Sequence, residues 1–247
     1  MLKKYFKQIF IMIFLIFSVI LTAEDNFMAV GNIKIVRPEP LLIKREDLNI
    51  TIEKDNTIKV ESMYTFSNLG EYNIKSTFMF WLDQIRENDN NNPNNSNKNN
   101  KGKYIKNIKF YSDYKKSQNL RAVIKFDENI YENQSVGNIQ REWFAISKTI
   151  PSKEEGKLGV YYDLQNTGFN KTKKFVYSFD LVSNFSEKNK VEILYINVYN
   201  KSGRKIDSIA YKDYEFKNLT GKKSDKEHYE LLVANVNLDE KLVINFK

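Results

Sequence analysis

Cysteine is absent from this chain of 247 residues. Its absence excludes disulfide bonds, thiolate nucleophiles, thiolate metal ligands and a lipid anchor attached through a cysteine. The chain is nevertheless long enough to bury a substantial apolar core. We therefore expect packed apolar area, without covalent cross-links, to stabilise the fold.

Histidine occurs once, as His228. A Ser-His-Asp triad would depend entirely on that residue, and no G-x-S-x-G segment is present to hold a nucleophilic serine. A catalytic zinc site usually needs several histidines, or histidine together with carboxylates. We interpret His228 as an ordinary polar residue at the start of a strand, and we assign no catalytic residue and no metal ligand.

Glycine is also scarce, with nine residues and no two adjacent. Neither G-x-G-x-x-G nor G-x-x-x-x-G-K-[ST] occurs, so the common phosphate-binding loops are excluded. In the asparagine-rich tract, Asn88-Asp89-Asn90 lacks the glycine and the bidentate glutamate of a calcium loop. The sequence therefore predicts no cofactor.

A long apolar run occurs only at the N-terminus, where Lys3, Lys4 and Lys7 precede an uncharged stretch from Gln8 to Ala23. This arrangement is typical of a secretory signal peptide. We predict a signal helix in residues 1–23, cleavage after Ala23, and an exported protein of the bacterial periplasm or extracellular space without stable membrane insertion after signal removal. The alternative is a retained N-terminal helix that tethers the protein to a membrane.

The formal net charge is +8, and it falls to +5 when the three lysines of the signal are removed. The remaining lysines are distributed along the chain and greatly outnumber the arginines. A nucleic-acid-binding protein would instead concentrate basic residues, including arginines, on one element. We therefore predict no nucleic-acid partner.

Apolar residues recur with a period of two, as in Ile58-Lys59-Val60-Glu61, and no amphipathic helix of more than two turns is evident outside the signal. This period is typical of strands with one buried face. The sequence predicts an all-β, antiparallel β-sandwich, with two packed β subdomains. The expected strands include 32–36, 48–52, 57–66, 74–82, 120–126, 175–181, 191–199, 229–236 and 242–246.

The strands are separated by short turn segments such as Asn68-Leu69-Gly70. Nine of the thirteen residues from Asn88 to Asn100 are asparagine, so we predict a disordered loop over 87–103, with a recognition loop as the alternative. A further boundary precedes the basic run at 171–174. We accordingly predict an N-terminal β-sandwich region over 24–166 and a C-terminal β region over 167–247.

A glycan hydrolase needs only two suitably placed carboxylates, so the acidic pairs of this chain are candidate catalytic groups. Adjacent acids in a strand point to opposite faces, so a catalytic pair would have to come from separate strands. The adjacent or near-adjacent pairs are Glu46-Asp47, Glu87 with Asp89, Glu154-Glu155, and Asp239-Glu240.

Two segments carry a resemblance to a known family. Glu46-Asp47-Leu48-Asn49-Ile50 matches the pattern E-D/N-L-x-I, and Val60 to Asn68 matches V-x-Y-x-F-x-N with one additional spacing residue. In these segments, and in Trp143 to Tyr162 and Val233 to Ile244, the chain resembles a family of exported bacterial proteins of unknown function. The resemblance implies export and strand-rich structure, and it brings no catalytic residues.

Together these features predict a non-enzymatic binding or scaffolding module of the bacterial cell envelope. Its expected partner is an envelope protein or a polysaccharide. The alternative function is a glycan hydrolase that uses carboxylates from separate strands.

Overall fold

The computed structural model describes residues 27–31, 34–35, 39–55, 57–86, 105–116, 119–120, 124–130, 138–164, 174–179, 190–221 and 226–247. The predicted signal peptide over 1–23, its cleavage after Ala23 and the asparagine-rich loop over 87–103 lie outside the described residues.

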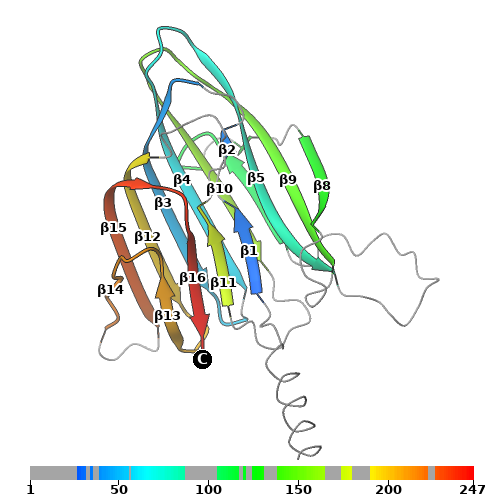
Figure 1. Ribbon diagram of the computed structural model, residues 1–247, viewed down its shortest axis with the longest axis vertical. Helices are drawn as coiled ribbons and strands as arrows, with labels where there is room; N and C mark the ends of the chain where they lie inside the picture. The colour runs from blue at the N-terminus through cyan, green and yellow to red at the C-terminus, as the bar shows by residue number, and fades with distance from the viewer. Residues whose placement is uncertain are drawn as a thin grey trace, which may run out of the picture.

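The described strands form two eight-stranded sheets that lie in two layers (Figure 1). Sheet A has the order β13 (Ile206–Ala210), β16 (Lys241–Phe246), β11 (Lys174–Ser178), β1 (Phe27–Gly31), β5 (Ile74–Arg86), β9 (Asn138–Ile150) and β8 (Ile124–Ile130), with β2 (Lys34–Ile35) also paired to β5. Sheet B has the order β14 (Lys217–Asn218), β15 (Glu227–Asn237), β12 (Lys190–Asn200), β3 (Leu41–Ile52), β4 (Ile58–Asn68), β10 (Glu155–Leu164), β6 (Ile105–Tyr111) and β7 (Asn119–Leu120).

The prediction of an all-β sandwich is confirmed. Pairing is antiparallel across most of both sheets, and the described strands are parallel where β1 meets β11 and where β3 meets β12. The expected strand over 57–66 corresponds to β4, and those over 191–199 and 229–236 lie within β12 and β15. The structure describes only residues 34–35 of the expected strand over 32–36 as a strand.

The division at residue 166 does not separate the sheets. Strand β11, from the C-terminal region, lies between β16 and β1 in sheet A, and β12 lies between β15 and β3 in sheet B. Each sheet therefore contains strands from both 24–166 and 167–247. A pattern of alternating residues indicates that a strand has a buried face, but it does not indicate which strand lies beside it.

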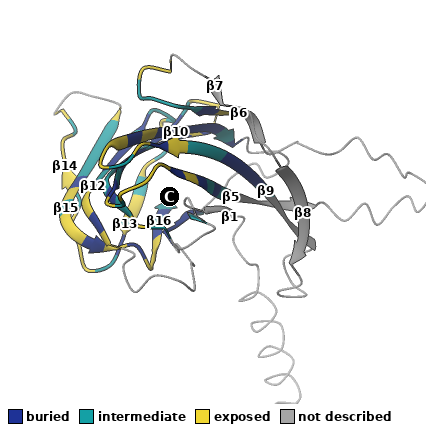
Figure 2. Ribbon diagram, turned by 90° about the horizontal axis from the view of Figure 1, so that it is seen from above, coloured by how far each residue is buried: buried dark blue, intermediate teal, exposed yellow. Residues whose placement is uncertain are grey.

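The core forms where the apolar faces of the two sheets meet. The alternate residues Val60, Tyr64 and Phe66 of β4 are fully buried. The Phe66 ring lies 4.9 Å from the ring of Phe78 in β5, centroid to centroid, and thereby joins the two layers. Figure 2 shows this buried interior between the layers and exposed residues on β13, β14 and β15.

Asn68 fixes the place where the chain crosses between the layers. Its side-chain amide donates to the carbonyl oxygens of Tyr72 (2.8 Å), Ile150 (3.1 Å) and Pro151 (3.0 Å). Its Oδ1 accepts from the backbone N–H of Gly70 at 2.8 Å. Asn68 thus links the β4–β5 turn to the β9–β10 turn, and its side chain is almost completely buried.

Candidate binding face

In three neighbouring strands of sheet B, β3, β12 and β15, the regular alternation of inward and outward side chains is interrupted at paired positions. Ile43, Val191 and Val236 are paired across the three strands and buried. The next paired residues that face inward are Glu46, Leu194 and Val233. The inward positions are therefore three residues apart on each strand instead of two. A register shift between Ile43 and Arg45 accompanies the change.

Such irregularities redirect side chains. Here they place two consecutive residues of each strand away from the core, and Asn235 has a φ of 55°. These outward pairs are Lys44-Arg45, Glu192-Ile193 and Ala234-Asn235.

From Glu46, Leu194 and Val233 onward the regular alternation resumes. Every second side chain then projects from the outer surface of sheet B, because the residues between them are buried in the core. We call the resulting surface the outer face. It comprises Arg45, Asp47 and Asn49 on β3, Ile193, Tyr195, Asn197 and Tyr199 on β12, and His228, Glu230 and Leu232 on β15.

A chain of hydrogen bonds crosses the outer face. His228 Nε2 lies 3.0 Å from Asn197 Oδ1, and Asn197 Nδ2 donates to Asn49 Oδ1 at 3.1 Å. Because Asn197 Oδ1 is the acceptor, His228 Nε2 carries the proton in this arrangement. The His228 ring also stacks on Tyr199, with centroids 4.3 Å apart. His228 lies near the start of β15, as predicted, but the sequence did not indicate that it would join this network.

The charged side chains beside this network are paired. Arg45 Nε donates to both oxygens of Asp47, at 2.9 and 2.8 Å, and this hydrogen bonding raises the pKa of Arg45. The Arg45 guanidinium lies 5.8 Å from the centre of the Tyr195 ring. The Tyr195 hydroxyl donates to Glu230 at 2.6 Å, and this hydrogen bond raises the pKa of Tyr195. The outer face therefore presents polar groups that contacts within the chain already hold in place, one ion pair and one hydroxyl–carboxylate hydrogen bond among them.

Large apolar side chains are exposed beside these polar groups. Leu232 is 62% exposed and Ile193 is 36% exposed. Their strand pairing makes them diagonal neighbours on β12 and β15. Exposed apolar area rimmed by polar residues is typical of an interaction surface.

The predicted separation of Glu46 and Asp47 onto opposite faces agrees with the geometry. Asp47 lies on the outer face, whereas Glu46 is completely buried between the sheets. Tyr177 donates to Glu46 Oε1 at 3.5 Å, and its hydroxyl also lies 2.9 Å from Ser62 Oγ. Burial raises the pKa of Tyr177.

The other acidic pairs are also engaged at separate places. Glu155 binds Lys44 at 2.9 Å, whereas Asp239 and Glu240 lie beside Lys212 at the turn before β16. Glu87 and Asp89 lie outside the described residues. Within the part of the chain that the structure describes, no group of three or more histidine or acidic side chains could hold a metal ion.

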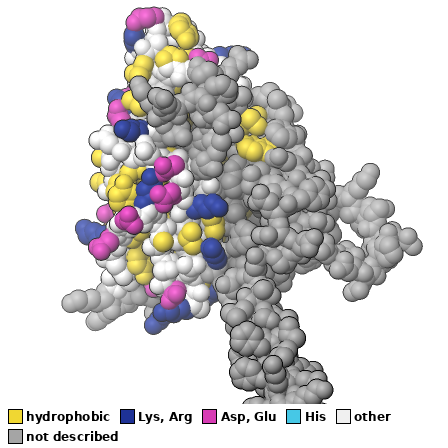
Figure 3. Space-filling model, in the orientation of Figure 1, with side chains coloured by type: hydrophobic (Ala, Val, Ile, Leu, Met, Phe, Trp, Pro, Cys, Tyr) yellow, Lys and Arg dark blue, Asp and Glu magenta, His cyan; other side chains and the backbone are white. Residues whose placement is uncertain are grey.

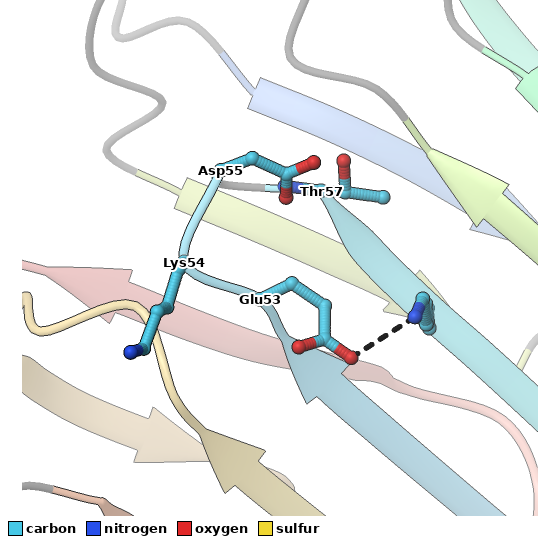
Figure 4. A pocket seen from close by; sticks show the side chains of 5 residues that line it. Glu53, Lys54, Asp55 and Thr57 are labelled. Carbon is cyan, nitrogen blue, oxygen red and sulfur yellow. Dashed lines mark hydrogen bonds and ion pairs between the residues drawn. The ribbon is translucent and has the colours of Figure 1, made fainter.

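A pocket of about 330 Å³ lies at the turn between β3 and β4 (Figure 4). It is lined by Glu53, Lys54, Asp55, Thr57 and Lys59. Glu53 lies 3.1 Å from the Lys59 ammonium, and Asp55 accepts from the Thr57 backbone N–H at 3.0 Å, a bond that lowers the pKa of Asp55. Because its walls are polar and both of its carboxylates are already engaged, by Lys59 and by the Thr57 backbone, this pocket is a weaker candidate than the outer face.

Acidic and basic side chains are interspersed over β13 and β16, on the side of the molecule that Figure 3 shows.

No helix in the described part of the chain has the length and apolar character needed to cross a membrane.

Comparison with known proteins supports the β-sandwich fold and assigns the chain to no family. No family model matches the chain, and no curated protein matches its sequence. A solved structure that is similar belongs to a Legionella pneumophila protein to which nutrient binding is attributed. The match has a TM-score of 0.60 at 11% identity and covers 88% of this chain and 71% of that one.

Two other solved structures are more distant. One is an M1 zinc metallopeptidase from Deinococcus radiodurans, with a TM-score of 0.40 at 10% identity; the match covers 83% of this chain and 42% of that one. The other is a Parabacteroides distasonis protein to which protease activity is attributed, with a TM-score of 0.41 at 5% identity, covering 83% and 40%. This chain thus spans less than half of either protein, and its similarity to solved structures establishes the β-sandwich fold alone.

Proposed function

We propose that this chain is an exported, non-enzymatic binding or scaffolding module of the bacterial envelope, and that it docks a protein partner through the outer face. The observation that carries the proposal is the exposure of Leu232 and Ile193 beside side chains already held by hydrogen bonds. Export is supported by the character of residues 1–23 and by the resemblance to an exported family. The nutrient binding attributed to the similar Legionella protein agrees with a binding role.

The composition of the outer face favours a protein over a polysaccharide. Tyrosine and arginine are enriched at the energetically important positions of protein interfaces, and a side chain that is already ordered loses less entropy on binding. Tyr195 and Arg45 meet both conditions, because one is held by Glu230 and the other by Asp47. An exposed leucine such as Leu232 adds apolar area that a protein surface can cover.

A hydrolase is less well supported by the outer face. A glycosidase needs one carboxyl group that remains protonated and another that is ionised. On sheet B, Asp47 binds Arg45, Glu61 binds Lys116 and Glu230 accepts from Tyr195. Each of these three carboxyl groups is thus already engaged by a different side chain of the protein itself. The arrangement is therefore better suited to recognition than to acid catalysis.

Substitution of Leu232 by lysine tests the proposal. A charge at the centre of an apolar contact must be desolvated on docking, so we expect recovery of the partner to fall at least about tenfold. The measurement is crosslinking in the producing cell, followed by affinity capture and quantification of the co-purified protein. L69K is the matched control, because Leu69 is similarly exposed, at 55%, but lies in the β4–β5 turn away from the outer face.

A single stoichiometric protein captured by the wild type and by L69K, and lost with L232K, would support the proposal. Equal recovery with both variants would refute docking through the outer face. Recovery of polysaccharide alone would replace the protein partner with a glycan.

A further inference from the structure

The segment over 112–116, which follows β6, is held against β4 and β9. The Tyr114 hydroxyl lies 2.6 Å from Thr65 Oγ1 on β4. The Lys148 ammonium on β9 donates to the carbonyl oxygen of Ser112 at 2.6 Å. Thr65 is only 8% exposed although it lies on the outward side of β4. This segment therefore covers the outward side of β4, the strand of sheet B that lies next to the outer face.

The last residue of the segment places its ammonium group between a carboxylate and an aromatic ring. Lys116 Nζ lies 2.9 Å from Glu61 Oε1 and 4.0 Å from the centre of the Tyr161 ring. A carboxylate combined with the face of an aromatic ring is a common means of recognising an ammonium group. Both ends of the ion pair are open to solvent, with the Lys116 and Glu61 side chains 46% and 40% exposed.

The ring is positioned by the strand beneath it. A Cβ atom at Gly159 would lie 2.8 Å from Cε2 of Tyr161 and 3.2 Å from its hydroxyl oxygen, so the ring lies directly against the glycine. The Tyr161 hydroxyl is buried and makes no hydrogen bond with any residue that the structure describes. Packing against Gly159, not a hydrogen bond of the hydroxyl, therefore holds the ring in place.

The backbone of Lys116 indicates that its occupation of the site has a cost. Its φ is 57°, in the left-handed region that residues with a Cβ rarely adopt. Strain of this kind persists only where surrounding contacts maintain it, and it is frequent at functional sites. Here the maintaining contacts include those of the lysine side chain itself.

We propose that Glu61, Tyr161 and Gly159 form a binding site for a primary ammonium group, in particular a lysine side chain of the docked protein, and that Lys116 occupies this site until the partner displaces it. The identity of the partner rests on the proposed function, whereas the ammonium site does not, because a small ammonium ion can probe it directly. Glu61 on β4 pairs with Asn49 on β3, and both side chains point outward from sheet B. The ammonium site therefore lies beside the outer face.

Titration with n-butylammonium chloride tests the site in K116G, which removes the competing side chain and suits a positive φ. If Lys116 fills the site nine-tenths of the time, its removal should lower the half-saturating concentration about tenfold relative to wild type. Chemical-shift changes of the Tyr161 ring report binding. K115A is the matched control, because it removes a neighbouring charge and should bind as wild type does. Sodium chloride at equal ionic strength corrects for screening, and n-butanol tests the need for charge.

Two results together support the proposal: tighter butylammonium binding by K116G, and loss of that gain in the double variant K116G/E61Q. Equal binding by wild type and K116G, equal shifts with n-butanol, or no effect of E61Q would each overturn it. If K116G does not fold, K116Q serves in its place, because it keeps a flexible polar side chain, one atom shorter, and removes the charge. Butylammonium binding without any captured partner would leave the site standing and refute the docking role alone.

Discussion

Replacement of Asn68 by alanine is expected to lower the free energy of unfolding by about 4 kcal/mol. The side chain makes four hydrogen bonds to backbone groups in two turns, and it is only 1% exposed. Alanine would leave those backbone groups without their partner, the carbonyl of Ile150 in a buried setting and the other three in part-buried ones, and each such loss costs about 1 kcal/mol. Urea-induced unfolding, followed by tyrosine and tryptophan fluorescence, measures the change.

Asn73 provides the comparison. Its side chain accepts a single hydrogen bond from the backbone N–H of Ser152, at 3.0 Å, in an exposed setting between the same two turns. N73A should therefore lower the free energy of unfolding by less than about 1 kcal/mol. Similar losses for N68A and N73A would mean that Asn68 does not hold the crossing between the layers.

Removal of the Tyr177 hydroxyl is expected to destabilise the fold by about 2 kcal/mol. The hydroxyl lies within hydrogen-bonding distance of Ser62 (2.9 Å), Tyr64 (3.3 Å) and Glu46 (3.5 Å), all of them buried between the sheets. Y177F would leave the carboxyl group of Glu46 with one donor fewer in an apolar interior. Thermal and urea unfolding of the variant measure the effect.

Tyr162 is the matched control for Tyr177. It is also buried, at 4% exposure, and its hydroxyl makes no hydrogen bond with any of the described residues. Y162F removes a buried polar atom without removing an interaction, so we expect unchanged or slightly increased stability. A loss as large as that in Y177F would show that the two hydroxyls do not differ in the way these contacts imply.

Several features of the fold could be predicted from local sequence. The alternation around Val60, Tyr64 and Phe66 indicates a half-buried strand, because side chains in a strand project alternately to its two faces. Asn68-Leu69-Gly70 marks the end of β4, although its sequence does not reveal that Asn68 reaches carbonyl groups of Ile150 and Pro151. That reach depends on two turns meeting, and they are more than eighty residues apart along the chain.

Local sequence does not predict the candidate binding face, and the reason is again spatial. Tyr195, Asn197 and Tyr199 occupy the polar positions of an alternating strand and, considered alone, indicate only a solvated face. They become a candidate site because β12 lies between β3 and β15, which brings Asn49 and His228 to the two sides of Asn197. A single acidic pair is equally ambiguous: the sequence predicts that Glu46 and Asp47 face opposite ways, but not which of them is buried.

The sequence by itself determined the class of the fold and the chemistry that is excluded. Alternating apolar residues specify strands, and the lack of cysteine removes disulfide bonds, because both follow from composition and local geometry. The tertiary structure alone decided the parallel pairing of β3 with β12 and the position of Lys116 over Tyr161. Those arrangements arise from contacts between residues far apart in the chain, and their relative free energies depend on packing that no local pattern encodes.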